Sequence, residues 1–207
     1  MKRETLRFWE NEWKRGKGIT SCWYVLLGRI KGKNLDIGCG DWKHYDLSSS
    51  EYSVGMDVSL NAFKRAKKNK IEKTSYDLVR ASAEKLPFKD GSFERVSMIE
   101  TLTLIGKDYG KVLDEVARVT KDNFVFTVTH KEIDNDILKN SVKGVEKVTF
   151  NEEEITELLK ERGLKIEELD AYTEEQCENF FRTVYDPSYA NMLNDRKVLM
   201  IISARKI

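Results

Sequence analysis

The chain has 207 residues, of which 40% are hydrophobic and 34% charged, a composition that excludes a disordered chain. Its 36 basic and 35 acidic residues nearly cancel, so no global field would attract nucleic acid. The sequence has neither the run of roughly 18 apolar residues of a membrane span nor a secretory signal, and its few cysteines and histidines lack metal-ligand spacing. We expect a cytoplasmic protein with no metal and no nucleic-acid or membrane partner; its oligomeric state is left open.

The predicted elements begin with a helical segment over residues 1–33, because Leu6, Trp9 and Trp13 follow helical spacing. From Asn34 onward, short apolar runs alternate with amphipathic helices. Strands are predicted at residues 35–38, 52–58, 77–81, 95–99, 124–128, 164–169 and 198–202. Three of the intervening helices are predicted to begin at the capping residues Ser59, Asp108 and Asn151. This alternation predicts an α/β domain with a parallel sheet covered on both faces.

The first predicted strand ends in the run from Leu35 to Gly40, with glycines at Gly38 and Gly40. Glycines allow a ligand close to the backbone, and the anion of Asp36 beside them suits a cationic amine better than a pyrophosphate. A dinucleotide fingerprint would need a third glycine where Lys43 stands. The alternative is that the two glycines only form a tight strand-to-helix connection.

The second predicted strand ends at Asp57, 17 residues beyond Gly40. An acidic side chain at this strand end is placed to accept hydrogen bonds from both hydroxyls of a ribose. The alternative is that Asp57 caps the following helix, although Ser59 is the better cap.

Four further segments belong to the same pattern: residues 83–93, 100–102, 115–119 and 149–155. Together they resemble the class I S-adenosylmethionine-dependent methyltransferases, and most closely the subgroup with the ubiquinone/menaquinone C-methyltransferases and small-molecule methyltransferases. The resemblance covers roughly residues 34–165. It implies a Rossmann-like fold with a seven-stranded, mostly parallel sheet, helices on both faces and an antiparallel last strand. Residues 1–207 would form one domain, with a helical lid (1–33), a cofactor-binding half (34–130) and a substrate-side half (131–207).

The implied cofactor is S-adenosyl-L-methionine, and the implied methyl acceptor is a small molecule. By resemblance, the cofactor contacts would be Asp36, Gly38 and Gly40 for the methionine end, Asp57 for the ribose, Val58, Ser82 and Ala83 for the adenine, and Met98, Ile99 and Glu100 near the transferred methyl. Two other functions stay open: a non-catalytic relative that binds the cofactor, and a nicotinamide-dependent oxidoreductase, which Lys43 disfavours.

Three departures from the family pattern lie in the cofactor half, and one of them is Glu94, which stands where aspartate is usual. Ser82 stands where the family has an aspartate that receives the adenine amino group, and a hydroxyl can also accept that bond. The run 120–123 replaces a glycine pair, and we expect Asn123 to adopt the left-handed turn in its place.

Methyl transfer needs a base only if the nucleophile must lose a proton. His130, at the carboxyl end of the fifth predicted strand, is the candidate; the alternative is a surface histidine that bonds to the backbone. His44 is a second candidate contact. Residues 131–148 and 173–197 are expected to build the acceptor pocket; the alternative for 173–197 is a helix that packs on the core. The N-terminal helical segment, with Trp9, Trp13 and Trp23, is expected to close over the cofactor as a lid.

Overall fold

The computed structural model describes residues 3–15, 32–42, 50–68, 75–133, 145–173 and 197–207. His44 and Trp23 lie outside the described residues, as does the greater part of the two segments expected to form the acceptor pocket.

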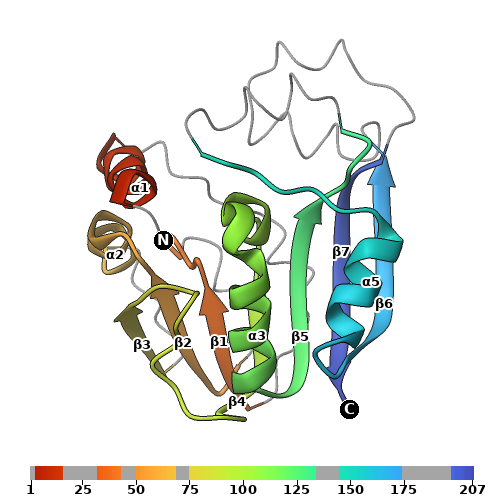
Figure 1. Ribbon diagram of the computed structural model, residues 1–207. Coiled ribbons are helices and arrows are strands. Elements are labelled where there is room, and N and C mark those ends of the chain that lie inside the picture. The colour runs from red at the N-terminus through yellow and green to blue at the C-terminus, as the bar shows by residue number, and fades with distance from the viewer. Residues whose placement is uncertain (1–2, 16–31, 43–49, 69–74, 134–144, 174–196) are drawn as a thin grey trace.

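The described residues form a seven-stranded sheet in the order β3-β2-β1-β4-β5-β7-β6 (Figure 1). The strands are β1 (Lys33–Ile37), β2 (Tyr52–Asp57), β3 (Ser75–Arg80), β4 (Phe93–Met98), β5 (Thr120–Thr129), β6 (Leu164–Thr173) and β7 (Lys197–Lys206). Strand β7 runs antiparallel to both of its neighbours, and the other pairs are parallel. The expected Rossmann-like topology is confirmed. Because the strand order reverses between β1 and β4, a ligand is expected beyond the carboxyl ends of these two strands.

Four α-helices are described: α1 (Arg3–Arg15), α2 (Leu60–Ala66), α3 (Tyr109–Val119) and α5 (Glu152–Lys160). Two short 3-10 turns, η3 (Leu102–Leu104) and η4 (Gly106–Asp108), lead into α3. Helices α3 and α5 lie on the same face of the sheet (Figure 1). Within the described ranges, no helix is both long enough and apolar enough to cross a membrane.

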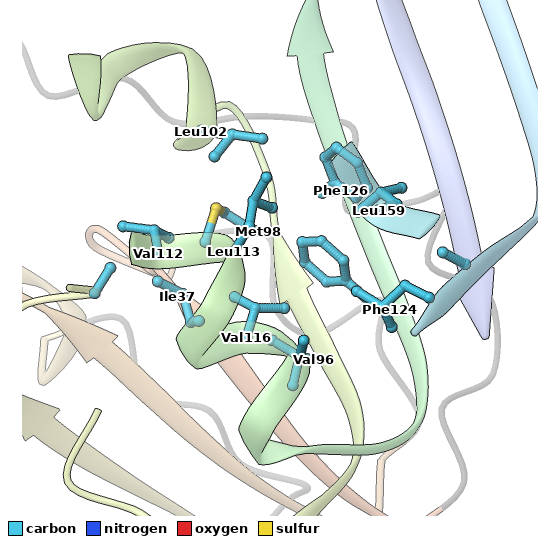
Figure 2. Packing of buried hydrophobic residues seen from close by; sticks show 14 of the residues in the cluster. Ile37, Val96, Met98, Leu102, Val112, Leu113, Val116, Phe124, Phe126 and Leu159 are labelled. Atoms are coloured by element: carbon cyan, nitrogen blue, oxygen red, sulfur yellow. The ribbon is translucent and has the colours of Figure 1, made fainter. Parts of the chain in front are cut away.

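The main core lies between this face and helices α3 and α5 (Figure 2). Val112, Leu113 and Val116 of α3 recur at helical spacing and are 0% exposed. Val96 and Met98 of β4, two residues apart, point toward them because alternate strand residues share a face. Burial of each such side chain contributes about 1.5–3 kcal/mol, so this packing fixes where the carboxyl end of β4 lies.

The other face of the sheet is covered by α2. Phe63 and Ala66 of α2 pack with Cys39 and Trp42 in a second apolar cluster. Gly55 of β2 faces this cluster, since a Cβ there would lie 3.1 Å from both the Cys39 sulfur and the Trp42 ring. Helices therefore cover both faces, as the sequence predicts.

Two of the three expected helix caps are present. The Ser59 hydroxyl accepts from the Ala62 amide at 3.2 Å, and Asn151 forms a reciprocal capping box with Glu154. The Asp108 prediction is wrong, because its carboxylate instead accepts a bond from the Lys111 ammonium at 2.8 Å. Asp108 has φ −83° and ψ 7°, not the extended conformation of a capping residue, because the 3-10 turn η4 leads directly into α3.

The prediction for Asn123 is also wrong. Strand β5 follows α3 without an intervening turn, and the positive-φ residues other than glycine among those described are Trp42 and Glu100. The Asn123 amide oxygen accepts from Arg95 at 3.2 Å, and its nitrogen donates to the Ser203 hydroxyl at 3.0 Å. A register irregularity between β4 and β5 accommodates the departure from the family pattern.

Candidate functional site

The glycine turn after β1 is approached closely from two sides. Gly38 and Gly40 have φ values of +75° and +56°, a region that favours glycine. A Cβ on Gly38 would collide with the Thr101 side chain after β4, and a Cβ on Gly40 would lie 2.6 Å from the Trp13 ring of α1. Both the conformation and the space therefore require glycine at these positions.

Asp36 braces this turn from inside the fold. Its carboxylate is 0% exposed and accepts bonds from the Trp42 indole at 2.8 Å and from the Ser97 hydroxyl at 2.9 Å. Trp42 is 1% exposed and holds a left-handed conformation with φ +54°. Sequence reasoning overlooked Trp42, although an aromatic residue two positions after the second glycine was a signal. A direct contact between Asp36 and a methionine amine stays a prediction.

Asp57 links the end of β2 to the glycine turn. Its carboxylate accepts from the Gly40 amide at 3.0 Å and from the Ser59 amide at 2.8 Å, and the residue is 8% exposed. Burial raises the pKa of Asp57, and the bonds from the backbone amides limit the rise. A carboxylate has about four lone-pair positions, so acceptor capacity remains for a ribose hydroxyl.

Helix α1 is fastened over this corner by Glu10. The Glu10 carboxylate accepts from the amides of Leu60 and Asn61 at 2.8 and 3.1 Å and from the Ser59 hydroxyl at 3.1 Å. Burial alone would raise the pKa of Glu10, but these bonds and the nearby Arg80 guanidinium lower it below its ordinary value. Sequence reasoning assigned no role to Glu10, because an acidic residue on an amphipathic helix resembles any solvated position.

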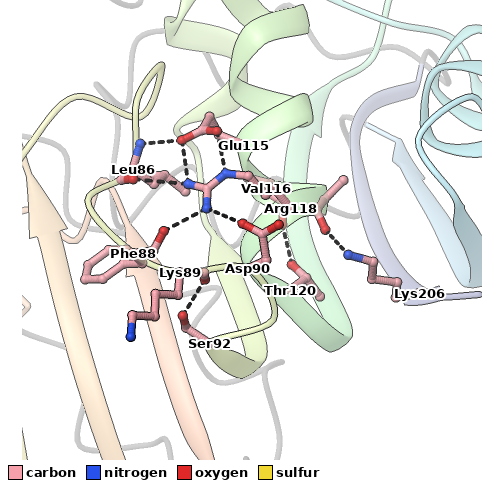
Figure 3. Close-up of polar contacts among 11 residues, drawn as sticks. Leu86, Phe88, Lys89, Asp90, Ser92, Glu115, Val116, Arg118, Thr120 and Lys206 are labelled. Carbon is pink, nitrogen blue, oxygen red and sulfur yellow. Dashed lines mark hydrogen bonds and ion pairs between the residues drawn. The ribbon is translucent and has the colours of Figure 1, made fainter.

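The segment after β3 contains the residues expected at the adenine edge. Ser82 is half-buried and its hydroxyl accepts weakly from the Glu84 amide at 3.4 Å, while Ala83 is 7% exposed. The segment is held against α3 by Arg118, which donates to Leu86, Phe88, Asp90 and Glu115 (Figure 3). Arg118 and Glu115 thus position a predicted contact segment without belonging to the predicted site.

The end of β4 places Glu100 beside the point where the strand order reverses. Its backbone has φ +51°, a conformation that costs a residue with a side chain about 1–2 kcal/mol, and its amide donates to the Thr127 hydroxyl at 2.7 Å. The carboxyl atom Oε2 is enclosed and has no hydrogen-bond partner among the described residues. Burial raises the pKa of Glu100 to about 7. The preceding residues Met98 and Ile99 are 0% and 5% exposed.

His130 is engaged on both sides of its ring. It is 2% exposed; Nδ1 accepts from the Glu132 amide at 3.1 Å, and Nε2 lies 3.0 Å from the Glu152 carboxylate. Glu152 also pairs with Lys197, and this ammonium together with the His130 ring lowers the pKa of Glu152 to about 2. His130 bonds to the backbone as the alternative expects, but it is buried and not at the surface. A catalytic role for His130 stays a prediction.

Residues 35–128 match the Methyltransferase domain family. A protein of Methanocaldococcus jannaschii is 39% identical over 113 residues, which is 53% of this chain and 42% of that protein. The demethylmenaquinone methyltransferase of Listeria welshimeri is 34% identical over 104 residues, which is 46% of this chain and 44% of that protein. This chain thus matches less than half the length of either relative.

Solved structures share the fold over a longer part of the chain. A solved complex between the Haloferax volcanii Trm112 methyltransferase activator and a protein described as a putative methyltransferase matches with a TM-score of 0.71 at 16% identity, over 98% of this chain and 96% of that one. The magnesium protoporphyrin IX methyltransferase of Synechocystis, solved with S-adenosylhomocysteine, has a TM-score of 0.62 at 15% identity, over 89% and 79%. Residues 35–128 of the chain thus match a methyltransferase domain family, and the chain shares the fold of these solved structures.

Proposed function

We propose that the chain transfers a methyl group from S-adenosylmethionine to a small-molecule acceptor. The observation that carries the proposal is the junction of β1 and β2, where the Asp57 carboxylate binds the Gly40 amide at 3.0 Å. This bond places a carboxylate and an open glycine backbone at the carboxyl ends of adjacent strands, next to the reversal in strand order. Such a position suits a nucleoside with an amino-acid tail.

The residues present fit this cofactor in two respects. Gly38 and Gly40 add no side chain of their own to the turn, and Asp57 keeps acceptor capacity for a ribose hydroxyl. The enclosed Glu100 oxygen without a partner suits a cationic ligand group, because an unpartnered buried carboxyl is costly without one. The further contacts that we assign are Asp36, Gly38 and Gly40 toward the methionine end, Val58, Ser82 and Ala83 toward the adenine, and Met98 and Ile99 beside the transferred methyl.

The chain's own groups would act mainly by alignment. When bound, the cofactor supplies a methyl group on a sulfonium, which is an excellent leaving group. Asp57 and the glycine backbone would hold its adenosine and amino-acid ends, and α1, fastened by Glu10 and packed through Trp13, would act as a lid that excludes water. A methyltransferase therefore needs few chemically active side chains.

A non-catalytic relative that binds the cofactor is the second candidate. The observation in its favour is Ser82, whose hydroxyl is a weaker acceptor than the aspartate that is usual at this position. A methyl-transfer assay distinguishes the two, because the relative would bind S-adenosylmethionine without producing S-adenosylhomocysteine with any acceptor.

The test of cofactor binding is a thermal and calorimetric titration with S-adenosylhomocysteine, with NAD as the matched control. Saturation at 100 times the dissociation constant should raise the free energy of unfolding by about 2.7 kcal/mol, and NAD should have no effect. Folded protein that shows no shift at millimolar S-adenosylhomocysteine would refute the proposal, and stabilisation by NAD alone would indicate an oxidoreductase.

A further inference from the structure

Glu100 combines three properties that the fold does not explain by itself. Its backbone occupies the left-handed region at φ +51°, it follows β4 at the reversal in strand order, and its Oε2 is enclosed without a partner among the described residues. A buried polar atom in a native fold normally has a partner, and an exception at the carboxyl end of a strand beside the reversal in strand order indicates a ligand position.

The backbone around Glu100 holds it in this conformation from two sides. Its amide donates to Thr127 of β5 at 2.7 Å, and the next residue, Thr101, donates its hydroxyl to the Ile99 carbonyl at 3.0 Å. The Thr101 side chain in turn lies against Gly38 of the glycine turn. Glu100 is therefore attached to the same junction as the proposed cofactor contacts.

Charged groups at the ends of the strands that pair with β4 have other partners in the described part of the chain. On β1, the Asp36 carboxylate accepts from Trp42 and Ser97; beyond β5, His130 bonds to Glu152. The 3-10 turn η3 carries no charged residue, and Asp108 of η4 pairs with Lys111. None of these groups contributes to the pKa of Glu100, which burial alone raises to about 7.

We propose that Glu100 is a catalytic residue that takes the proton of the methyl acceptor when the sulfonium of S-adenosylmethionine is bound beside it. The proposal rests on the proposed function. It implies an acceptor whose nucleophilic nitrogen, oxygen or carbon carries a proton that must be removed for transfer.

The protons balance over one catalytic turnover. Binding of the cationic donor releases the Glu100 proton to solvent, because a neighbouring positive charge favours the carboxylate. In the transfer step, the nucleophile forms a bond to the methyl carbon, the carbon–sulfur bond breaks, and its electron pair stays on sulfur as a thioether. The acceptor proton moves to Glu100, so the neutral product, S-adenosylhomocysteine, leaves beside a protonated carboxyl.

The experiment compares proton release by the charged and the neutral ligand. Calorimetry at pH 6 in buffers of different ionisation enthalpy should show that S-adenosylmethionine releases up to about 0.9 proton more than S-adenosylhomocysteine. By the same linkage, the preference for S-adenosylmethionine should grow by up to about tenfold between pH 6 and pH 8. Glu100→Gln, which keeps the size of the side chain, should remove both differences while still binding S-adenosylhomocysteine.

The outcomes separate this proposal from the proposed function. If neither ligand binds, the methyltransferase proposal fails; if both bind with equal proton release, or if the difference survives in Glu100→Gln, the role of Glu100 is overturned. Should Glu100→Gln fail to fold, carbon-13 NMR of the glutamate carboxyls in the unmutated protein decides. One carboxyl should titrate near neutral pH in the free protein and in the S-adenosylhomocysteine complex, and be ionised at pH 6 with S-adenosylmethionine. Absence of such a resonance would refute the proposal.

Discussion

Two buried carboxyls occupy the carboxyl edge of the sheet, and they differ in what surrounds them. Asp57 after β2 accepts from the amides of Gly40 and Ser59, whereas Oε2 of Glu100 after β4 has no partner in the described part of the chain. Burial raises the pKa of both groups. Only at Asp57 do backbone bonds favour the ionised form.

Asp57 therefore organises the fold, whereas Oε2 of Glu100 lacks a partner among the described residues. Asp57 joins two loops, so the adenosine side of the proposed site is formed before a ligand arrives, and α1 already covers it through Glu10 and Trp13. Glu100 is held through its backbone amide by Thr127, and its Oε2 has no partner among the described residues, so this oxygen can respond to a ligand charge. A preformed binding side next to a responsive reacting side is an arrangement suited to group transfer.

The largest effect is expected from Asp57→Ala. Removal of the carboxylate leaves two amides without their acceptor, so the free energy of unfolding should fall by about 2–4 kcal/mol in urea denaturation. S-adenosylhomocysteine binding should weaken at least about tenfold, or about 1.4 kcal/mol, by calorimetry. Asp57→Asn keeps the size and one carbonyl oxygen, so its losses should be intermediate.

A sugar analogue tests the ribose assignment separately from stability. The unmutated protein should prefer S-adenosylhomocysteine over its 2′-deoxy form, and Asp57→Ala should largely lose that preference. If the variant distinguishes the two sugars as well as the parent does, Asp57 does not bind the ribose, and its role is confined to the glycine turn.

The second expected effect concerns how stability depends on pH. Glu100 has a pKa of about 7 in the folded chain, against the ordinary value of 4.5, so the folded state holds its proton more tightly. Its favourable contribution is present below pH 4.5 and is lost as the pH rises toward 7, by up to about 3 kcal/mol. Urea denaturation of the parent and Glu100→Gln at pH 5 and 8 should show that the variant lacks this loss. Equal changes in both proteins would mean that Glu100 is not the titrating group.

The sheet could be predicted from the sequence because buried parallel strands are short apolar runs, and amphipathic helices separate them. The caps at Ser59 and Asn151 were predicted because their bonds are local. The errors at Asp108 and Asn123 arose where a neighbouring element decided the backbone: η4 leads into α3, and β5 pairs with β4 and β7.

The sequence predicted those site residues that lie at strand ends. It did not predict the residues that reach the site from distant parts of the chain. Asp57 lies at a strand end in the sequence, so its position followed from the element pattern. Glu10 and Trp13 reach the same corner from at least 27 residues away in sequence, a relation that no local pattern encodes. The missing partner of Glu100 is likewise a property of the packed fold alone.

The smallest effect is expected from Gly40→Ala, and Gly91→Ala is its matched control. Both glycines have similar positive φ values, +56° and +58°, but a Cβ on Gly40 would meet the Trp13 ring at 2.6 Å, whereas a Cβ on Gly91 would meet nothing within 4 Å. In both variants the free energy of unfolding should fall by the roughly 1 kcal/mol that alanine costs in this conformation. In Gly40→Ala it should fall by about 1–2 kcal/mol more, because α1 must shift.

In a Trp13→Ala background the excess loss of Gly40→Ala should vanish, since the two residues are then uncoupled. Equal losses for the two glycine variants, measured by urea denaturation in the parent background, would show that α1 does not rest on the glycine turn. The contrast between a preformed adenosine side and a responsive reacting side would then lose part of its basis.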